Sequence, residues 1–498
     1  MTAESSQPSI RHLLGVTLCS ALLAGCMAGP DFLRSTDELV AVDLVPRVDY
    51  TDRPPAMSAP LPAQWWMLFN DPVLADLEGR AQIDNLDLQI SLARIEQSRA
   101  QLGIVSSQLS PTFAGGASYA HEALSEHGKF AALGAPTQPN DFWQFGFDAT
   151  WEIDLWGRAR RAREGAKAAL EGATYDREAA RVALAAEVAR TYLQLRGTQA
   201  QLDVAHQNLA VAERLLAVAE SREHNGVATR FETLSASAQL ASSKASIPEL
   251  IQHRNLLMNA LASLIAAEPR TLDAQLRESM PLPLPPSRVP TGIPSELARR
   301  RPDILSAEAQ LHAATAAIGV AKADFYPRVG LKGRAGVEAF EADDLGTWDS
   351  RQFSVGPTVY LPIFQGGRLQ QRLALNEAKQ KAAALLYRQT VLRAWHEIDN
   401  ALDAWAAQRS QYAQLSISYE HSKQAFHTAQ RGYQEGAADY LSVLTAQREL
   451  LSSQTRLNVS ATNATLTLVN LFKALGGGWN SDEVATAMAW PSPQGAHE

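Results

Sequence analysis

The sequence has little cysteine, no long hydrophobic segment and no large excess of charge, and each absence excludes a class of protein. Two cysteines occur in 498 residues, and Cys19 lies inside an apolar stretch, so disulfide bonds do not hold this chain together. That stretch, residues 13–24, is the longest apolar run and is too short to cross a bilayer as a helix. The formal net charge of -8 comes from interspersed acidic and basic residues, which excludes nucleic acid as the expected partner.

The motifs of common enzyme classes are also missing. Gly128-Lys129 is not a phosphate-binding loop, because it lacks the upstream glycine and the following Ser or Thr. Gly330, Gly333 and Gly336 recur at every third position and do not form a dinucleotide-binding loop. Neither a Gly-x-Ser-x-Gly elbow nor a His-Glu-x-x-His pair is present, and the 11 histidines are scattered. We therefore expect no catalysis, no metal site and no cofactor other than a covalent lipid.

We expect a covalent lipid because the amino-terminal sequence resembles a bacterial lipoprotein signal. The apolar run follows Arg11 and His12 and ends in the sequence LAGC at residues 23–26. The resemblance implies cleavage before Cys26 and acyl chains on this residue, where each buried methylene contributes ~0.8 kcal/mol to membrane binding. Met27 follows the cysteine, and the absence of an aspartate there favours sorting to the outer membrane. The alternative is an uncleaved segment with Cys26 as a buried thiol.

The chain contains a tandem repeat. Residues 85–111 align without a gap on residues 301–327, at an offset of 216, and the offset is then about 210 for the next long segment. The paired positions include Asp87 with Asp303, Gly103 with Gly319, Pro111 with Pro327, Gly157 with Gly367, Gly226 with Gly436 and Leu234 with Leu444. A duplicated unit of roughly 200 residues predicts a pseudo-symmetric assembly in which each copy supplies equivalent walls.

The repeats divide the chain into six regions. We expect a signal peptide, an acylated extended segment, repeat 1, a Pro-rich extended connector, repeat 2 and a polar tail. These regions are residues 1–25, 26–75, 76–270, 271–294, 295–476 and 477–498.

Two kinds of helix are predicted in each repeat. Apolar residues three and four apart indicate one amphipathic helix of about 30 residues at its start, ended by Pro111 or Pro327. A much longer helix follows the strands of each repeat. At ~1.5 Å per residue it is about 100 Å long. A turn at Gly226 or Gly436 then leads into a return helix, so that the two helices form a hairpin. The predicted ranges are 76–108, 158–224 and 229–267 in repeat 1, and 295–323, 368–435 and 440–475 in repeat 2.

Four segments alternate apolar and polar residues with the period of a β-strand. They lie at about residues 112–120, 142–152, 328–340 and 351–361, so each repeat supplies two. By these bounds they are about 9–13 residues long, enough for a tilted strand, which needs about 9–11 residues to cross a hydrocarbon core. The alternative is a soluble sheet with one face on a core, but no further strands are predicted to pack against it. Pro357 indicates a strand end or an unpaired amide position.

Four strands cannot form a closed membrane barrel alone, because lipid cannot satisfy the open edges of a sheet. Two chains give 8 strands, whose interior is filled by side chains, whereas three give 12 and leave a lumen. We therefore predict a mainly α fold with a small β-barrel part. Three chains form a 12-stranded barrel, which a long α-helical barrel continues across the periplasm.

Together these segments resemble the TolC-like outer-membrane efflux proteins, and within them the lipoprotein channels of NodT and OprM type. The motifs that carry the resemblance are Cys26 with GPDF at 29–32, WWMLFNDP at 65–72, RRPDI at 300–304, LPIFQGGR at 361–368, TAQR at 445–448 and KALGGGW at 473–479. The resemblance implies a homotrimeric, passive duct in the outer membrane that carries drugs or other toxic small molecules. It also implies a periplasmic adaptor and an inner-membrane pump of the RND type as partners. The alternatives are the duct of a type I protein secretion system and a structural envelope lipoprotein that does not conduct.

The resemblance further implies a periplasmic gate just after the second glycine turn, at Tyr433, Leu441, Thr445 and Arg448. Leu441 would be an apolar constriction, which gates by dewetting. Tyr433 and Arg448 would donate hydrogen bonds that hold neighbouring helices closed. Thr445 departs from many relatives, which place an acidic residue there, and Asp439 is a candidate replacement. Simple helix packing is the alternative role for the four gate residues.

Contact with the adaptor is expected at the two hairpin tips. The matching positions are Arg222 and Gly226 in repeat 1 and Arg431 and Gly436 in repeat 2. Either glycine is equally explained as a turn residue with a positive φ.

Overall fold

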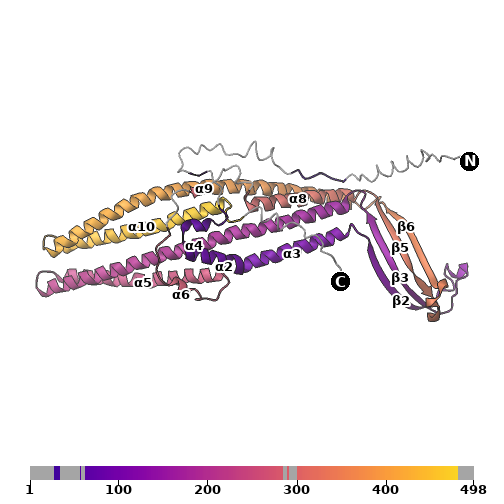
Figure 1. Ribbon diagram of the computed structural model, residues 1–498, viewed down its shortest axis with the longest axis horizontal. Helices are drawn as coiled ribbons and strands as arrows, with labels where there is room; N and C mark the ends of the chain where they lie inside the picture. The colour runs from indigo at the N-terminus through magenta and orange to yellow at the C-terminus, as the bar shows by residue number, and fades with distance from the viewer. Residues whose placement is uncertain (1–26, 34–55, 58–61, 284–288, 291–299, 480–498) are drawn as a thin grey trace, which may run out of the picture. The chain divides into compact units, whose positions relative to one another are not determined.

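The computed structural model describes residues 27–33, 56–57, 62–283, 289–290 and 300–479 (Figure 1). Cys26, the predicted signal peptide and the end of the predicted tail lie outside these residues. The chain divides into two compact units, each containing parts of both repeats. Unit 1 takes in Met1–Arg34, Ile95–Gly172 and Ala307–Tyr387, and unit 2 takes in Ser35–Arg94, Ala173–Ser306 and Arg388–Glu498.

Unit 1 contains the four predicted strands, which form one antiparallel sheet in the order β2-β3-β5-β6 (Figure 1). The strands are β2 (Thr112–Glu122), β3 (Asn140–Ile153), β5 (Arg328–Ala339) and β6 (Arg351–Tyr360). Pro357 lies inside β6, opposite Leu331, and β6 is an edge strand, where a residue without an amide hydrogen is tolerated. Among the described residues, neither β2 nor β6 has a strand paired to its outer edge.

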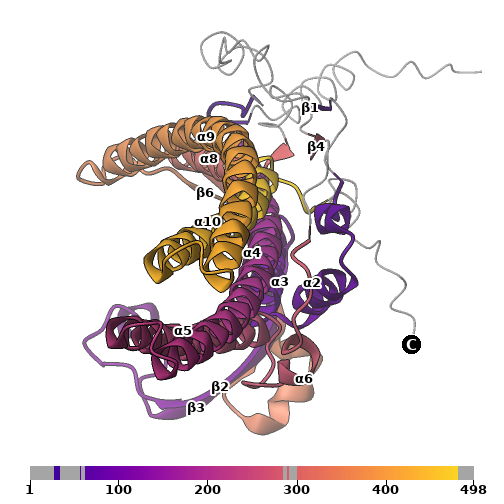
Figure 2. The same ribbon diagram turned by 90° about the vertical axis from the view of Figure 1, so that its left-hand side faces the viewer.

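The helices follow the predicted pattern, except that the helix predicted from residue 295 begins at Pro302, and residues 295–299 lie outside the described part of the chain. They are α2 (Pro72–Asp84), α3 (Leu86–Ser107), α4 (Arg158–His224), α5 (Arg230–Leu264), α6 (Asp273–Leu276), α8 (Pro302–Ala323), α9 (Arg368–Gln434) and α10 (Tyr440–Ala474). Figure 2 shows the two hairpins, in which α5 returns beside α4 and α10 returns beside α9. The short elements are β1 (Ala56–Met57), β4 (Val289–Pro290), η1 (Trp65–Phe69), η2 (Ala131–Leu133), η3 (Ala342–Gly346) and η4 (Trp348–Ser350). None of the described helices is long and apolar enough to span a membrane.

The prediction of a single helix over residues 76–108 is wrong, because the structure has two helices there, α2 and α3, separated at Asn85. The Asn85 side-chain oxygen accepts hydrogen bonds from the backbone amides of Asp87 and Leu88, which caps α3. Its side-chain amide donates to the carbonyl oxygen of Leu264 at 2.9 Å. The preceding helix also starts earlier than predicted, at Pro72, where Asp71 caps its first turn.

The two hairpin turns are equivalent in the two repeats. Gly226 has a φ of +71° and Gly436 a φ of +77°, so both adopt the left-handed conformation that favours glycine. In each turn two successive amides donate to one carbonyl oxygen, that of Arg222 in the first and of Gly432 in the second. The turn role predicted for both glycines is therefore confirmed.

The main core of unit 2 joins the helices of both repeats to the segment before α2. Trp65 and Tyr192 are fully buried together with Phe472 of α10. The rings of Trp65 and Phe472 lie 5.0 Å apart between centroids. Full burial of a large apolar side chain contributes about 1.5–3 kcal/mol, so the aromatic segment before α2 is a structural part of this unit.

Candidate functional site

One face of the sheet in unit 1 is apolar and exposed. The strand register places odd-numbered residues of all four strands on the same face, as in the row Phe113, Ala149, Gly333 and Val355. Nine large apolar residues of this face are between 38% and 80% exposed. They are Phe113, Tyr119, Phe145, Phe147, Trp151, Leu331, Phe353, Val355 and Val359. In a soluble sheet such a face would be covered by a core, so this face requires an apolar surrounding.

The opposite face of the same sheet is polar. The Gln144 side-chain amide donates to Glu338 Oε2 at 3.3 Å across neighbouring strands. Arg334 and Asp148 form a loose ion pair at 3.9 Å on the same face. A sheet that is apolar on one face and polar on the other, with two open edges, has the pattern of a membrane barrel wall that faces lipid outside and water inside.

A second candidate site lies in unit 2, where the ends of the two hairpins meet around Tyr433. This side chain is 2% exposed and packs in a small apolar cluster. The other members are Leu215, Ala219, Ala236, Phe426, Tyr440, Val443 and Leu444. The Tyr433 hydroxyl donates to Glu232 Oε2 at 3.2 Å, which links α9 of the second hairpin to α5 of the first. We call the group Arg222, Glu232 and Tyr433 the hairpin lock.

Arg222 completes the hairpin lock from α4. Its guanidinium lies 4.5 Å from the centroid of the Tyr433 ring, and its Nη1 donates to the Tyr433 carbonyl oxygen at 3.4 Å. Burial, with the carboxylate of Glu232 close by, raises the pKa of Tyr433 to about 12. The hydroxyl is therefore neutral and able to donate at physiological pH.

Tyr433 is buried, whereas the other three predicted gate residues are exposed. Leu441 is 62% exposed, and Thr445 donates its hydroxyl hydrogen back to the Leu441 carbonyl oxygen at 2.8 Å. Arg448 is also exposed on α10. Asp439, the candidate acidic replacement, caps α10 instead, because its carboxylate accepts from the Ser442 amide at 2.8 Å. Hydrogen bonds from Ser442 hold the pKa of Asp439 below its ordinary value.

At the tips, three of the four predicted docking residues are exposed, namely Gly226, Arg431 and Gly436. Arg222 differs, because its side chain is half-buried against Tyr433. Sequence reasoning missed Glu232. Its signal was present, since Thr229 and Glu232 have the spacing of a capping box, and the structure contains that box at the start of α5.

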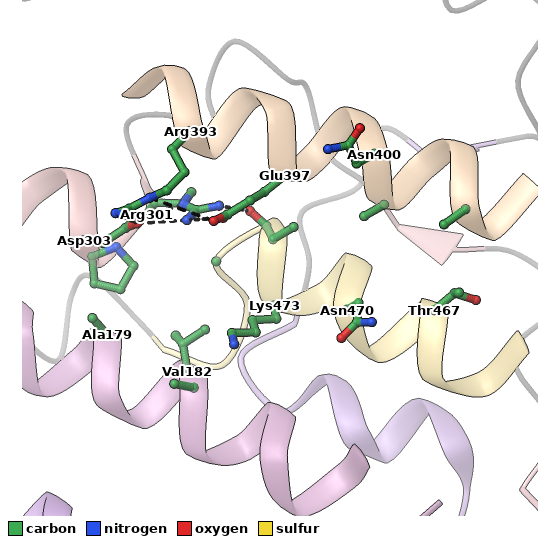
Figure 3. Close-up of a pocket in the computed structure, with 16 residues that line it drawn as sticks. Ala179, Val182, Arg301, Asp303, Arg393, Glu397, Asn400, Thr467, Asn470 and Lys473 are labelled. Atoms are coloured by element: carbon green, nitrogen blue, oxygen red, sulfur yellow. Dashed lines mark hydrogen bonds and ion pairs between the residues drawn. The ribbon is translucent and has the colours of Figure 1, made fainter. Parts of the chain in front are cut away.

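A cavity of about 600 Å³ in unit 2 lies beside the buried Arg301 (Figure 3). The Arg301 guanidinium contacts Asp303 Oδ2 at 2.8 Å and Glu397 Oε2 at 2.7 Å, and it donates to the Ala474 carbonyl oxygen at 2.8 Å. Lys473 and Asn470 of α10 line another side of the cavity (Figure 3). Arg301 belongs to the RRPDI motif, and its contacts show that the motif joins the start of α8 to α9 and α10.

The comparisons with known proteins decide the family. The model of the outer membrane efflux protein family matches residues 77–267 and 293–477. The chain belongs to this family. It is 32% identical over 480 residues to the pyoverdine export outer membrane protein OpmQ of Pseudomonas putida, covering 95% of this chain and 98% of that protein. It is 31% identical over 424 residues to the outer membrane protein OprJ of Pseudomonas aeruginosa, covering 84% and 86%.

Solved structures of channels share the fold of this outer membrane efflux protein. The outer-membrane channel OprN has a TM-score of 0.85 and 32% identity, covering 91% of this chain and all of that chain (100%). The CmeC outer membrane channel of Campylobacter jejuni has a TM-score of 0.84 and 25% identity, covering 93% and 98%. The predicted family, the TolC-like fold and the function as an outer-membrane efflux channel are confirmed.

Proposed function

We propose that three copies of this chain form a passive duct in the outer membrane. The apolar, exposed face of a four-stranded sheet with two open edges carries this proposal. Pairing β6 of one copy with β2 of the next satisfies both edges, and three sheets of four strands give a barrel of 12. The polar face then lines the lumen. The long helices α4 and α9 begin within a few residues of β3 and β6, so each copy can continue the wall beyond the membrane.

The partners follow from the family. The duct receives its cargo in the periplasm through an adaptor protein and an inner-membrane pump, for which the RND type is our proposal. Drugs or other toxic small molecules are the proposed cargo. The exposed tip residues Gly226, Arg431 and Gly436 form the proposed adaptor contact. The proposed gate combines the hairpin lock with the exposed Leu441, Thr445 and Arg448 of α10, which are free to meet the same residues of the other copies.

We propose in addition that Cys26 carries the lipid anchor. Met27, the residue after Cys26, lies against Gly157 just before the start of α4. Replacement Cys26→Ser should abolish incorporation of labelled palmitate while leaving the channel able to conduct. Label on the variant protein would show that the anchor is elsewhere.

Edge-to-edge closure is tested by cross-linking in a Cys19→Ser, Cys26→Ser background, which has no other cysteine. One cysteine is placed on the polar face of β2, at Ser118, and a second is scanned along the polar face of β6, from Gln352 to Thr358. A closed ring gives covalent dimers and trimers and no larger species after oxidation. A ladder that continues beyond trimers, or protein that stays monomeric at every register, would overturn the assembly.

Conduction is tested separately in planar bilayers with the purified protein. A duct gives discrete current steps, whereas a structural envelope lipoprotein gives none. A protein secretion duct would also conduct, and it is distinguished by export: loss of the gene then removes a secreted polypeptide and leaves drug sensitivity unchanged.

A further inference from the structure

The residues that follow Cys26 lie in a fitted site on α4 and α8 in unit 1. Gly29 has a φ of +90°, and a Cβ added to it would lie 2.5 Å from the Cα of Gly319. Conversely, a Cβ on Gly319 would lie 2.8 Å from the carbonyl oxygen of Ala28. A Cβ on Gly157 would lie 3.0 Å from Met27 Cγ. The amino-terminal segment, residues 27–33, therefore approaches both helices at distances that only glycine permits.

Arg161 supplies the polar half of this site. Its side chain is 2% exposed, and its Nη2 donates to Asp31 Oδ1 at 2.5 Å. Its Nε donates to the Ala28 carbonyl oxygen at 3.3 Å, and its Nη1 donates to Glu164 Oε2 at 2.8 Å. A buried guanidinium is tolerated only when its charge and its hydrogens are partnered, and two of these three partners belong to the amino-terminal segment.

The same contacts connect the two repeats. Arg161 and Glu164 come from α4 of repeat 1, whereas His312 comes from α8 of repeat 2, and His312 Nε2 lies 2.9 Å from Glu164 Oε1. The ring of Phe32 stacks on the His312 ring with 4.4 Å between centroids. The Ala28 amide also donates to the carbonyl oxygen of Trp156, just after β3, at 3.0 Å. The segment thus touches both repeats at the point where the sheet meets the helices of unit 1.

Because the sequence is duplicated, the residues of this site have counterparts in the other repeat, but those counterparts do not form such a site. Gly103 is the counterpart of Gly319, and a Cβ added there meets nothing within 4 Å. Gly367 is the counterpart of Gly157, and its added Cβ meets only Gln370 Oε1, at 3.6 Å. At the offset of 210, the residue matching Arg161 is Gln371. Only one of the two equivalent positions is thus adapted to a bound segment, so the fit is not a by-product of the repeat.

We propose that Gly157, Arg161 and Gly319 form a docking site for the chain's own amino-terminal segment, and that the docked segment joins the two repeats at the foot of the sheet. The docking site also fixes where the anchor enters the membrane, because Cys26 directly precedes the segment. That consequence rests on the proposed lipid, whereas the docking itself does not.

The first test compares two glycine substitutions in the middle of helices. Both Gly319→Ala and Gly103→Ala favour the helix, because alanine has the higher helix propensity, but only the first intrudes on the docked segment. Hydrogen–deuterium exchange of the assembled protein reports on the Ala28 amide. We expect protection in the wild type and in Gly103→Ala, and a loss of roughly tenfold or more in Gly319→Ala. An unprotected wild-type segment, or equal protection in both variants, would overturn the docking site.

The second test changes the polar contact with little risk to folding. Asp31 is 80% exposed on its side chain, so Asp31→Asn alters the ion pair with Arg161 and no core packing. We expect faster exchange of the Ala28 amide, because the ion pair is replaced by a weaker hydrogen bond from the guanidinium to a neutral amide oxygen, with the barrel and its conductance unchanged. Unchanged exchange would show that the ion pair between Arg161 and Asp31 does not hold the segment.

Both measurements are repeated in the Cys26→Ser background. Protection that persists there establishes docking without the lipid, so failure of the anchor assignment and failure of the docking site remain distinguishable. Protection that requires Cys26 would overturn the docking site as an autonomous feature of the fold.

Discussion

The hydroxyl of Tyr433 donates a hydrogen bond to Glu232 Oε2 at 3.2 Å, and this bond joins the ends of the two helical hairpins of one chain. The two residues are 201 positions apart in the sequence. Any outward movement of one hairpin relative to the other must break this bond and separate Arg222 from the Tyr433 ring. Opening at this end would therefore have to break the hairpin lock, together with the apolar cluster around Tyr433.

Tyr433→Phe should favour the open hairpins. The substitution keeps the ring in the apolar cluster and removes only the bond to Glu232, which as a hydrogen bond to a charged group is worth about 1.5–3 kcal/mol. We expect about a tenfold or greater increase in the open population, seen as larger bilayer conductance and greater uptake of bulky antibiotics. Tyr412→Phe, on the exposed surface of the same helix, is the matched control. Equal behaviour of the two variants would assign Tyr433 to packing alone.

The lock should also respond to alkaline pH. The pKa of Tyr433 is raised to about 12 from an ordinary value of 10, so the closed form retains a proton that a separated hairpin would release. The contribution to closure is complete below pH 10 and is lost as the pH rises through about 12. Conductance of the wild type should therefore rise over this interval more than that of Tyr433→Phe. Parallel pH profiles of the two proteins would contradict this link.

The two faces of β6 should tolerate charge very differently. Val355 is 75% exposed on the apolar face, and Ser354 lies next to it on the polar face. Val355→Arg places a charge in lipid, at a cost of about 2–4 kcal/mol near the membrane midplane. Ser354→Arg places the same charge toward the lumen. We expect the first variant to reach the outer membrane in much lower amount, measured by membrane fractionation. A soluble sheet would tolerate both exposed arginines alike.

Arg301→Lys should destabilise unit 2. Lysine retains the charge, but it cannot contact Asp303, Glu397 and the Ala474 carbonyl oxygen with one planar group. Glu397 is 45% exposed, so solvent weakens its ion pair with Arg301. We therefore expect the substitution to lower the free energy of unfolding by about 2 kcal/mol.

The control for Arg301→Lys is Arg456→Lys, in which the exposed pair with Glu449 changes. This substitution should cost under about 0.5 kcal/mol. Thermal unfolding of both proteins in detergent, followed by circular dichroism, makes the comparison. A similar loss in both would show that the buried contacts of Arg301 add nothing.

The sequence predicted the strands and long helices because their signals are periodic and local. The alternation in β3 is regular from Trp143 to Trp151, and Gly226 and Gly436 mark turns because their positive φ favours glycine. What it could not predict depends on contacts between distant residues. The break at Asn85 involves the carbonyl oxygen of a residue 179 positions away. The sequence places Arg222 at a hairpin tip, but its contact with Tyr433 exists only because the two hairpins pack together. The pairing of Arg161 with Asp31 is likewise 130 positions apart.

Glu78 should make unit 2 less stable as the pH rises. This residue lies on the buried face of α2 with Leu74 and Leu77, and neither carboxyl oxygen has a hydrogen-bond partner among the described residues. Burial raises the pKa of Glu78 well above its ordinary value of 4.5, so the folded protein holds a proton that the unfolded chain releases. The contribution of Glu78 to stability is then greatest below pH 4.5 and falls as the pH rises through the raised pKa.

Glu78→Leu should remove this dependence. Leucine continues the apolar face of α2 and has no charge to bury, so we expect a gain of about 1–3 kcal/mol in the free energy of unfolding at neutral pH. The gain should shrink as the pH approaches 4.5, where the wild-type carboxyl is protonated in both states. Asp76→Asn, on the exposed side of the same helix, should show neither effect. The gain depends on pH only if it comes from removing a buried acid. If the two proteins differ in free energy of unfolding by the same amount from pH 4.5 to neutral, the effect of Glu78→Leu comes from packing instead.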